Sequence, residues 1–442
     1  MNKLNKKKVG RVFIGPIEIA GYYANLAKGF KKIGVDCDYI TYTPHPFDYG
    51  GESNIPYLIR MARFFNRYRK KQRKSYFAKA FFALPGELLT SIWAMFAIFR
   101  YDVFIFGFGC SLTHFSWDMR ILKLLNKRVI SNLGHGSESR LPFMDGALQS
   151  SNGVKQPSIE ILQSRSRTMR KKIHLIESHS VVIGAPFSSS HFLNKNFINW
   201  FCLGVPIGFP VKDKSNIGRQ NADAQITRIL HSPSHPALKG SEQIKQAIYN
   251  LITKGYQVEL VLIHGKPHSE VIREICRCDF VVDQIYSDTP MAGFATEAAW
   301  FGKPAVVGGY GFDYLKTFIS KDIWPPSKTC HPDEIEQAIE SLIVNREERL
   351  RLGTEAQKFV CEKWNPAAVA RRYLRIIEGN IPDEWWLDPH SVTYMEGCGQ
   401  PVERTKENIR QMVEQFGIES LQLSHRPDLE QAFLKFAEIK PN

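Results

Sequence analysis

The stretch "RVFIGPIEIAGYYANLAKGFKKIGVDCDYITY", residues 11–42, carries two hydrophobic periodicities in succession. An apolar run typical of a short buried strand comes first, and a glycine-containing turn follows it. Apolar residues then recur at the spacing of one helix face: Tyr22, Leu26, Phe30 and Ile33. Residues 35–42 alternate like a second strand. A strand-helix-strand unit of this kind predicts a parallel sheet.

Similar transitions from strand to loop recur along the chain and predict two α/β domains. They stand at residues 101–109, 127–136 and 178–186, and a second series runs from 226 to 378 after a polar, turn-rich stretch at 211–225. We therefore expect two Rossmann-like domains that face each other across a cleft. The predicted boundaries are 1–210 for the N-terminal domain, 211–380 for the C-terminal domain and 381–442 for a C-terminal extension with a helix.

The overall composition suits a globular protein with an anionic partner. The chain has 442 residues, of which 43% are hydrophobic, and a formal net charge of +14. That charge is compatible with nucleic acid, anionic lipid or a phosphorylated substrate. The eight cysteines show no paired zinc-like spacing and suggest reduced thiols, and no signal peptide is expected at the N-terminus. The sequence therefore predicts a cytoplasmic protein.

One strongly basic segment narrows the choice of partner. Residues 60–79 hold nine Lys or Arg and no acid, interleaved with aromatics, and an apolar run follows at 80–99. Pro85, Gly86 and Glu87 interrupt that run, so it is too short to span a bilayer. Single-stranded nucleic acid would suit basic and aromatic side chains too. The apolar neighbour favours an anionic membrane surface, which residues 60–99 are predicted to contact, and no nucleic-acid partner is expected.

Polar side chains in several loops at strand ends are candidates for a binding site. Ligands of open α/β sheets bind at the carboxyl ends of the strands. Lys239 precedes a helix and could reach phosphate oxygens, although a solvated surface lysine is equally compatible with its position. His135 ends a predicted strand and could face a reacting centre or be an ordinary loop histidine.

The helix predicted within "GFATEAAWFGKPAVV", residues 293–307, carries one acid, Glu297. A carboxylate accepts the hydrogen bonds of vicinal ribose hydroxyls well, and the amino end of this helix would favour a diphosphate. Ordinary surface charge is the alternative for Glu297. His231 and His235 stand four residues apart, but Pro233 and Pro236 exclude a regular helix that would present both to a metal. The "DCD" at 36–38 is explained by strand alternation. No metal site is expected.

Several motifs in a fixed order resemble the GT-B glycosyltransferases of the retaining, GT4-like group, over most of residues 10–378. In the first half the motifs are "AGYYANLAKGFKKIGVD" and the stretch that ends in "HGSESR". In the second half "LKGSE", "CDFVVDQ" and "GFATEAAWFGKPAVV" match the group's pattern, as does the helical "NREERLRLGTEAQKFVCEKW".

This resemblance implies roles for individual residues. A UDP- or GDP-linked sugar would be the donor, without cofactor or metal, and its nucleotide-sugar contacts would be Lys239, Gly240, Gly293, Phe294 and Glu297. His135 would lie near the donor sugar as a catalytic residue, and Gly21 would lie on the acceptor side. The sequence departs from the group's pattern in having Thr289 in place of the first acid and Ser234 in place of an arginine. Asp288, beside Thr289, is the second predicted catalytic residue.

The sequence thus predicts a retaining, metal-independent hexosyltransferase (EC 2.4), peripheral on the inner face of the membrane. It would move a sugar from a nucleotide-sugar donor to a glycan or lipid-linked acceptor, as in the biosynthesis of a surface polysaccharide. Two alternatives stay open. One is a nucleotide-sugar epimerase on the same fold, and the other is a catalytically silent protein that binds an anionic surface.

Overall fold

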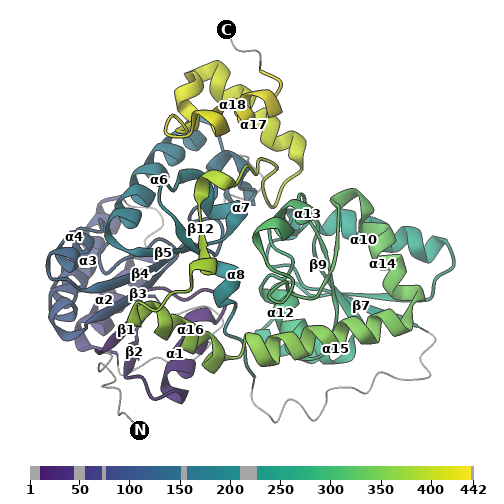
Figure 1. The fold of residues 1–442 in the computed structure, drawn as a ribbon, viewed down its shortest axis with the longest axis horizontal. Coiled ribbons are helices and arrows are strands. Elements are labelled where there is room, and N and C mark those ends of the chain that lie inside the picture. The colour runs from purple at the N-terminus through teal and green to yellow at the C-terminus, as the bar shows by residue number, and fades with distance from the viewer. Residues whose placement is uncertain (1–9, 44–54, 72–75, 151–156, 210–225, 440–442) are drawn as a thin grey trace.

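The computed structural model describes residues 10–43, 55–71, 76–150, 157–209 and 226–439. It confirms the predicted fold class, because the chain forms two α/β domains, each built on its own largely parallel sheet (Figure 1). This is the GT-B arrangement expected from the sequence. The predicted linker at 211–225, and with it the predicted boundary after residue 210, lies outside the described residues.

The N-terminal sheet has seven strands in the order β12-β6-β5-β4-β3-β1-β2. All neighbouring strands are parallel except β12 and β6, and Val12 of β1 lies between Cys37 of β2 and Val103 of β3. β1 and β3 are buried along their whole length, which explains their continuous apolar sequences. The strands are β1 (Val12–Gly15), β2 (Cys37–Tyr39), β3 (Val103–Gly107), β4 (Arg128–Asn132), β5 (Val181–Gly184), β6 (Phe197–Asn199) and β12 (Trp386–Leu387).

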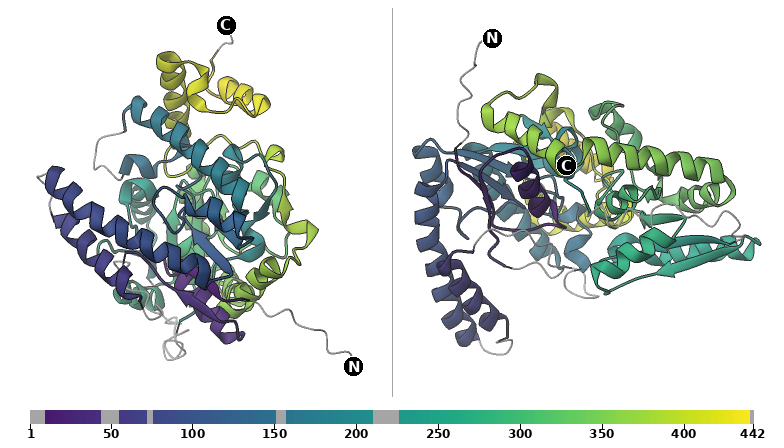
Figure 2. Two further views of the ribbon diagram at one scale, coloured as in Figure 1. Left: turned by 90° about the vertical axis from the view of Figure 1, so that its left-hand side faces the viewer. Right: turned by 90° about the horizontal axis from the view of Figure 1, so that it is seen from below.

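Helices cover both faces of this sheet, and two of them form a hairpin that extends beyond the body of the domain (Figure 2). The hairpin consists of α2 and α3, and α3 continues through Pro85. Within the described parts of the chain, no helix is long and apolar enough to cross a membrane. The helices are α1 (Tyr22–Lys32), α2 (Tyr57–Lys71), α3 (Tyr76–Arg100), α4 (Asp118–Leu124), α5 (Ala147–Ser150), α6 (Ile159–His179), α7 (Pro186–Ser189) and α8 (Trp200–Leu203).

The C-terminal sheet has five parallel strands in the order β11-β10-β9-β7-β8. Its strands are β7 (Thr227–His231), β8 (Val258–Leu262), β9 (Phe280–Gln284), β10 (Ala305–Gly308) and β11 (Lys328–Cys330). Its helices are α9 (Pro236–Lys239), α10 (Ser241–Thr253), α11 (His268–Arg277), α12 (Gly293–Trp300), α13 (Phe312–Leu315), α14 (Ile335–Val344) and α15 (Arg346–Lys363).

The chain returns to the N-terminal domain after α15. Helix α16 (Pro366–Glu378) packs on α1, where Tyr22 Oη donates to Gly204 O and shares a hydrogen bond with Tyr373 Oη. The extension then adds β12 to the edge of the N-terminal sheet. Its helix α17 (Val402–Phe416) packs against α6, and α18 (Pro427–Phe436) packs against α17 (Figure 1). The extension is therefore part of the folded body.

Candidate active site between the two domains

Loops from both sheets meet between the domains, and each leaves the carboxyl end of a parallel strand. Loops after β1 and β4 come from the N-terminal sheet, and loops after β7, β8 and β9 come from the C-terminal sheet. This edge is where open α/β sheets bind ligands. The predicted site residues all lie in these loops or at the start of the helices that follow them.

His135 and Gly21 come together on the N-terminal side. Gly21 precedes α1 in the left-handed conformation, with φ of 80°, and the helix then presents Tyr22 and Tyr23 to the histidine. Nε2 of His135 lies 2.8 Å from Oη of Tyr23, and both tyrosine rings pack edge-on against the imidazole. Burial lowers the pKa of His135 to about 3. The imidazole is therefore neutral at physiological pH.

Glu138 is a buried carboxyl group in the same loop that the sequence analysis did not single out. Its Oε1 accepts a 2.7 Å hydrogen bond from the backbone N–H of His135, and its Oε2 is buried without a hydrogen-bond partner among the described residues. Burial raises the pKa of Glu138 to about 8, although backbone hydrogen bonds oppose the shift. At neutral pH this side chain is predominantly a protonated acid, and the motif "HGSESR" was the signal that could have marked it.

Asp288, predicted as catalytic, forms an ion pair across the domain interface. Its Oδ2 lies 2.5 Å from Nη2 and 3.1 Å from Nε of Arg140, which also binds Asp145 at 2.8 Å. The Arg140 side chain is 7% exposed, so the bridge is shielded from water. Arg140, 148 residues away in sequence, is a second member of the site that sequence reasoning missed.

Lys239 and Gly240 lie on the C-terminal side, where the turn after α9 packs against the residue that follows β9. Nζ of Lys239 is 3.2 Å from Oδ1 of Asp283 and 2.6 Å from Oε1 of Gln284. Gly240 adopts a left-handed conformation, and a Cβ there would collide with Ile285. The lysine predicted to bind phosphate is therefore already paired with a buried carboxylate.

The loop from β9 to α12 holds Thr289, where the sequence departs from the pattern of the group that it resembles. The Ser287 hydroxyl organises this loop by donating to Thr289 O, while the Thr289 hydroxyl is buried without a hydrogen-bond partner among the described residues. Gly293 begins α12, no side chain caps its first N–H groups, and Phe294 is half-buried beside it. These two predicted residues thus lie at a helix end with exposed backbone donors.

Glu297 lies on the second turn of α12 and contacts a residue from a different loop. Its Oε1 is 2.8 Å from Nε2 of His268, the first residue of α11. This hydrogen bond raises the pKa of His268 against the opposing effect of burial. The ring of Phe209 stacks on the imidazole of His268, with ring centroids 6.2 Å apart. His268 carried no sequence signal, because only its place after β8 connects it with the site.

Three residues that the sequence analysis considered as possible metal ligands have structural partners instead. His231 is buried between Val282 O and the Ser241 hydroxyl, Asp36 pairs with Arg11, and Asp38 accepts from Tyr101. Across the described ranges, no three His, Cys, Asp or Glu side chains are arranged to hold a metal ion.

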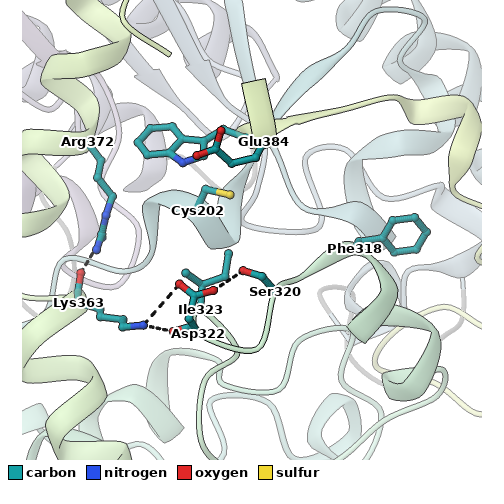
Figure 3. A pocket seen from close by; sticks show the side chains of 9 residues that line it. Cys202, Phe318, Ser320, Asp322, Ile323, Lys363, Arg372 and Glu384 are labelled. Atoms are coloured by element: carbon teal, nitrogen blue, oxygen red, sulfur yellow. Dashed lines mark hydrogen bonds and ion pairs between the residues drawn. The ribbon is translucent and has the colours of Figure 1, made fainter. Parts of the chain in front are cut away.

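A pocket of about 470 Å³ lies away from these residues, where α8, α16 and the first part of the extension meet the C-terminal domain (Figure 3). Arg372 in its wall donates to Leu203 O and Lys363 O, and Lys363 pairs with Asp322. None of the predicted site residues lines it. It is lined by Cys202, Phe318, Ser320, Asp322, Ile323, Lys363, Arg372, Glu384 and Trp385.

Comparison with known proteins gives weak likenesses only. No family model matches the chain, and no curated protein matches its sequence. Among solved structures, Anabaena HepE in complex with UDP-glucose aligns at 13% identity and a TM-score of 0.46, over 84% of this chain and all of HepE. WaaG, a glycosyltransferase involved in lipopolysaccharide biosynthesis, aligns at 8% identity and a TM-score of 0.46, over 84% of this chain and all of WaaG.

A Listeria monocytogenes protein provisionally assigned as a UDP-N-acetylglucosamine 2-epimerase aligns at 11% identity and a TM-score of 0.42, over 84% of this chain and 95% of that one. Glycosyltransferases and an epimerase therefore stand among the structural neighbours. Similarities of this size do not decide between them, and the fold assignment rests on the strand order and connectivity described above.

Proposed function

We propose that this protein is a hexosyltransferase (EC 2.4) that takes its sugar from a UDP- or GDP-linked donor, with retention and without a metal ion. The observation that carries the proposal is Glu297 on the second turn of α12. It lies at the carboxyl edge of the C-terminal sheet, with His268 as its one hydrogen-bond partner among the described residues. A half-buried carboxylate held in this way can accept hydrogen bonds from both hydroxyls of a ribose.

The diphosphate would lie between the ribose and Arg140. The free N–H groups at the start of α12 favour negative charge, and Lys239, in the turn between β7 and α10, would supply a cation. Lys239 faces Asp283, so a bound diphosphate has to compete with that carboxylate for the lysine. The sugar would then lie near His135 and Asp288. Because His135 is neutral, it would orient a hydroxyl by hydrogen bonding and supply no charge.

A screen of nucleotide sugars tests this proposal. We expect UDP- or GDP-sugars to raise the melting temperature and to be turned over, with mass spectrometry separating transfer or hydrolysis from epimerisation. A changed sugar configuration without release of nucleotide would favour the epimerase. Failure of every nucleotide sugar to bind would leave the silent binding protein.

The ribose contact has a direct test with a matched control. Glu297→Gln should weaken nucleotide binding about tenfold, the loss of about 1.4 kcal/mol. Glu242→Gln, on the exposed first turn of α10, should leave binding unchanged. Lys239→Ala is also expected to weaken binding, but it strands the buried carboxylate of Asp283. The double variant Lys239→Met with Asp283→Asn removes both charges and is the cleaner probe of the phosphate contact.

We further propose that the acceptor is a glycan or lipid-linked saccharide at an anionic membrane, on the cytoplasmic side. The support comes from α3, which is apolar on two faces. Its inner face packs Trp93, Ala94 and Ala97 against the sheet, as part of a core with Phe13 and Phe104. Its outer face exposes a stripe at helical spacing: Leu84, Leu88, Ile92, Met95, Phe96 and Phe99.

Charge around this stripe fits lipid headgroups. Exposed Arg60 and Arg67 of α2 lie in the same hairpin, and Arg100 ends α3 with about half of its side chain in contact with solvent. Leu84 is 73% exposed and Phe99 is 71% exposed, which is unusual for apolar side chains in one stripe. An apolar stripe with a basic neighbour is the pattern of a helix that lies in a membrane interface.

Sedimentation with vesicles tests this part of the proposal. The protein should bind vesicles that contain phosphatidylglycerol, and salt should weaken that binding. Phe96→Asp should abolish it, whereas Val344→Asp, at an exposed apolar position of the C-terminal domain, should not. Equal binding to neutral vesicles contradicts the electrostatic part. A dimer in solution that Phe96→Asp dissociates would show that a second copy covers the stripe instead.

A further inference from the structure

The C-terminal extension crosses between the two domains at the predicted site. After β12, Tyr314 of the C-terminal domain donates from its hydroxyl to Ser391 O and accepts a hydrogen bond from the N–H of Thr393. Tyr394 then stacks on Phe187 of the N-terminal domain, with ring centroids 3.8 Å apart. Neighbouring residues of the extension therefore bind different domains.

Two consecutive residues of the extension, Cys398 and Gly399, also bind different domains. The N–H of Cys398 donates to Met144 O in the N-terminal domain at 3.0 Å, and the N–H of Gly399 donates to Tyr286 O in the C-terminal domain at 2.8 Å. The N–H of Gly146 returns a bond to Cys398 O at 2.9 Å. Two consecutive backbone donors thus link the loop after β4 to the loop after β9.

The crossing point adjoins the charged groups described above. Cys398 forms a backbone bridge with Asp145, which binds Arg140. The Cys398 thiol is buried, and burial raises its pKa to about 12, while the nearby charge of Arg140 opposes the shift and that of Asp288 adds to it. Gly399 adopts a left-handed conformation with φ of 72°, and a Cβ there would collide with the side chain of Leu238, the neighbour of Lys239. The extension therefore passes directly beside the arginine-aspartate bridge and the phosphate-facing turn.

The C-terminal extension is packed tightly on the N-terminal domain, so it can restrain the position of the other domain. Helix α17 packs on α6, and Phe433 of α18 meets Phe143 edge to face. Arg426 is fully buried and donates to Pro389 O and Val392 O, which secures the turn before the crossing. Interfaces between domains of one chain usually permit relative motion. Here a segment whose helices pack on the N-terminal domain also binds the C-terminal domain.

From these contacts we propose that the loop Gly397–Gln400 is a clasp that holds the two domains in one arrangement and forms a wall of the site beside Asp288. Gly399 is its positioning residue, because only a glycine lets the backbone pass Leu238 and reach Tyr286. The clasp itself rests on the observed contacts, and its role in binding a nucleotide sugar rests on the proposed function.

A set of glycine variants tests the clasp. Gly399→Ala adds both a left-handed alanine and a collision with Leu238. Gly379→Ala is the matched control, because Gly379 has nearly the same φ of 77° and open space around its Cβ. Both variants carry the strain of a left-handed alanine, so a difference between them isolates the collision with Leu238 in the clasp. Leu238→Ala in the Gly399→Ala background makes room for the new methyl group.

Hydrogen exchange and interdomain distance are the measurements, and both are made without ligand. Gly399→Ala should speed amide exchange at residues 396–400 at least tenfold and broaden the distance between fluorophores on α6 and α14. Gly379→Ala should change neither, and the added Leu238→Ala should restore most of both, because only the strain of the left-handed alanine then remains. Unchanged exchange in Gly399→Ala, or an effect that Leu238→Ala does not reverse, would overturn the clasp.

Nucleotide binding supplies a separate outcome. If a nucleotide-sugar donor binds the natural chain, Gly399→Ala should lower the affinity for it, and the added Leu238→Ala should restore that affinity. If donor affinity is unaffected although the domains have loosened, the clasp does not form a wall of the site. If no nucleotide binds any variant, the proposed function fails, and the exchange and distance results still decide whether the clasp exists.

Discussion

The two ends of the candidate site differ in how their polar groups are held. At the end near His135, Arg140 binds Asp145 and Asp288 in a buried network, and Glu138 is sealed from water. At the other end, Glu297 and His268 are partly exposed and share one hydrogen bond. The first end, called the junction below, joins the two domains through buried ion pairs as well as lining the site. The second, called the open end, can bind a ligand without breaking a buried ion pair.

This difference separates stability from binding. Substitutions at the junction should change the free energy of unfolding strongly because they strand buried charges. Substitutions at the open end should change binding more than stability. Three variants order the two ends by the size of the expected effect.

The largest effect is expected at Arg140. Arg140→Ala leaves Asp288 and Asp145 without their cation in a buried setting, and the cost should be about 3–5 kcal/mol. Denaturant unfolding measures it. Arg351→Ala, which breaks two exposed ion pairs on α15, should cost less than about 1 kcal/mol. An equal loss of unfolding free energy in both variants would show that the ion pairs of Arg140 contribute no more to stability than exposed ones do.

A smaller, pH-dependent effect is expected at Glu138. Its pKa is raised from about 4.3 in an unfolded chain to about 8. The contribution of protonated Glu138 to the free energy of unfolding is therefore fully present below pH 4 and is lost as the pH rises through 8. Glu138→Gln is always neutral. It should be about 1–3 kcal/mol more stable than the natural chain at pH 9, and the gap should close toward pH 4. A gap that does not depend on pH would contradict a buried, protonated Glu138.

The smallest effect is expected at the open end. The bond to Glu297 raises the pKa of His268, so its contribution to stability is fully present below the unfolded value of about 6.5 and fades as the pH rises past it. Glu297→Gln should remove less than about 1 kcal/mol, and only on the acid side. Unfolding measured from pH 5 to 9 checks this. A loss that persists at pH 9 would mean that Glu297 has a structural role as well.

Much of the fold and part of the site could be predicted from local pattern. The strand-helix-strand pattern predicted parallel sheets, and the rule that ligands bind at carboxyl ends of strands directed attention to the loops of His135 and Lys239. Asp288 was singled out by the resemblance to the GT-B group. These positions depend on short-range periodicity, which a single sequence displays. What the side chains do there is a different matter, because Lys239 is paired with Asp283 and Asp288 is paired with Arg140.

Sequence by itself determined that the chain builds two α/β domains and where their functional loops begin, because hydrophobic period and glycine placement act within a few turns. Tertiary structure alone decided that Arg140 meets Asp288 across the interface, that His268 reaches Glu297, that α3 leaves an apolar face in solvent, and that the extension passes between the domains. The physical reason is that ion-pair partners, burial and exposure arise only when segments far apart in the chain pack together, and no local pattern encodes which segments those are.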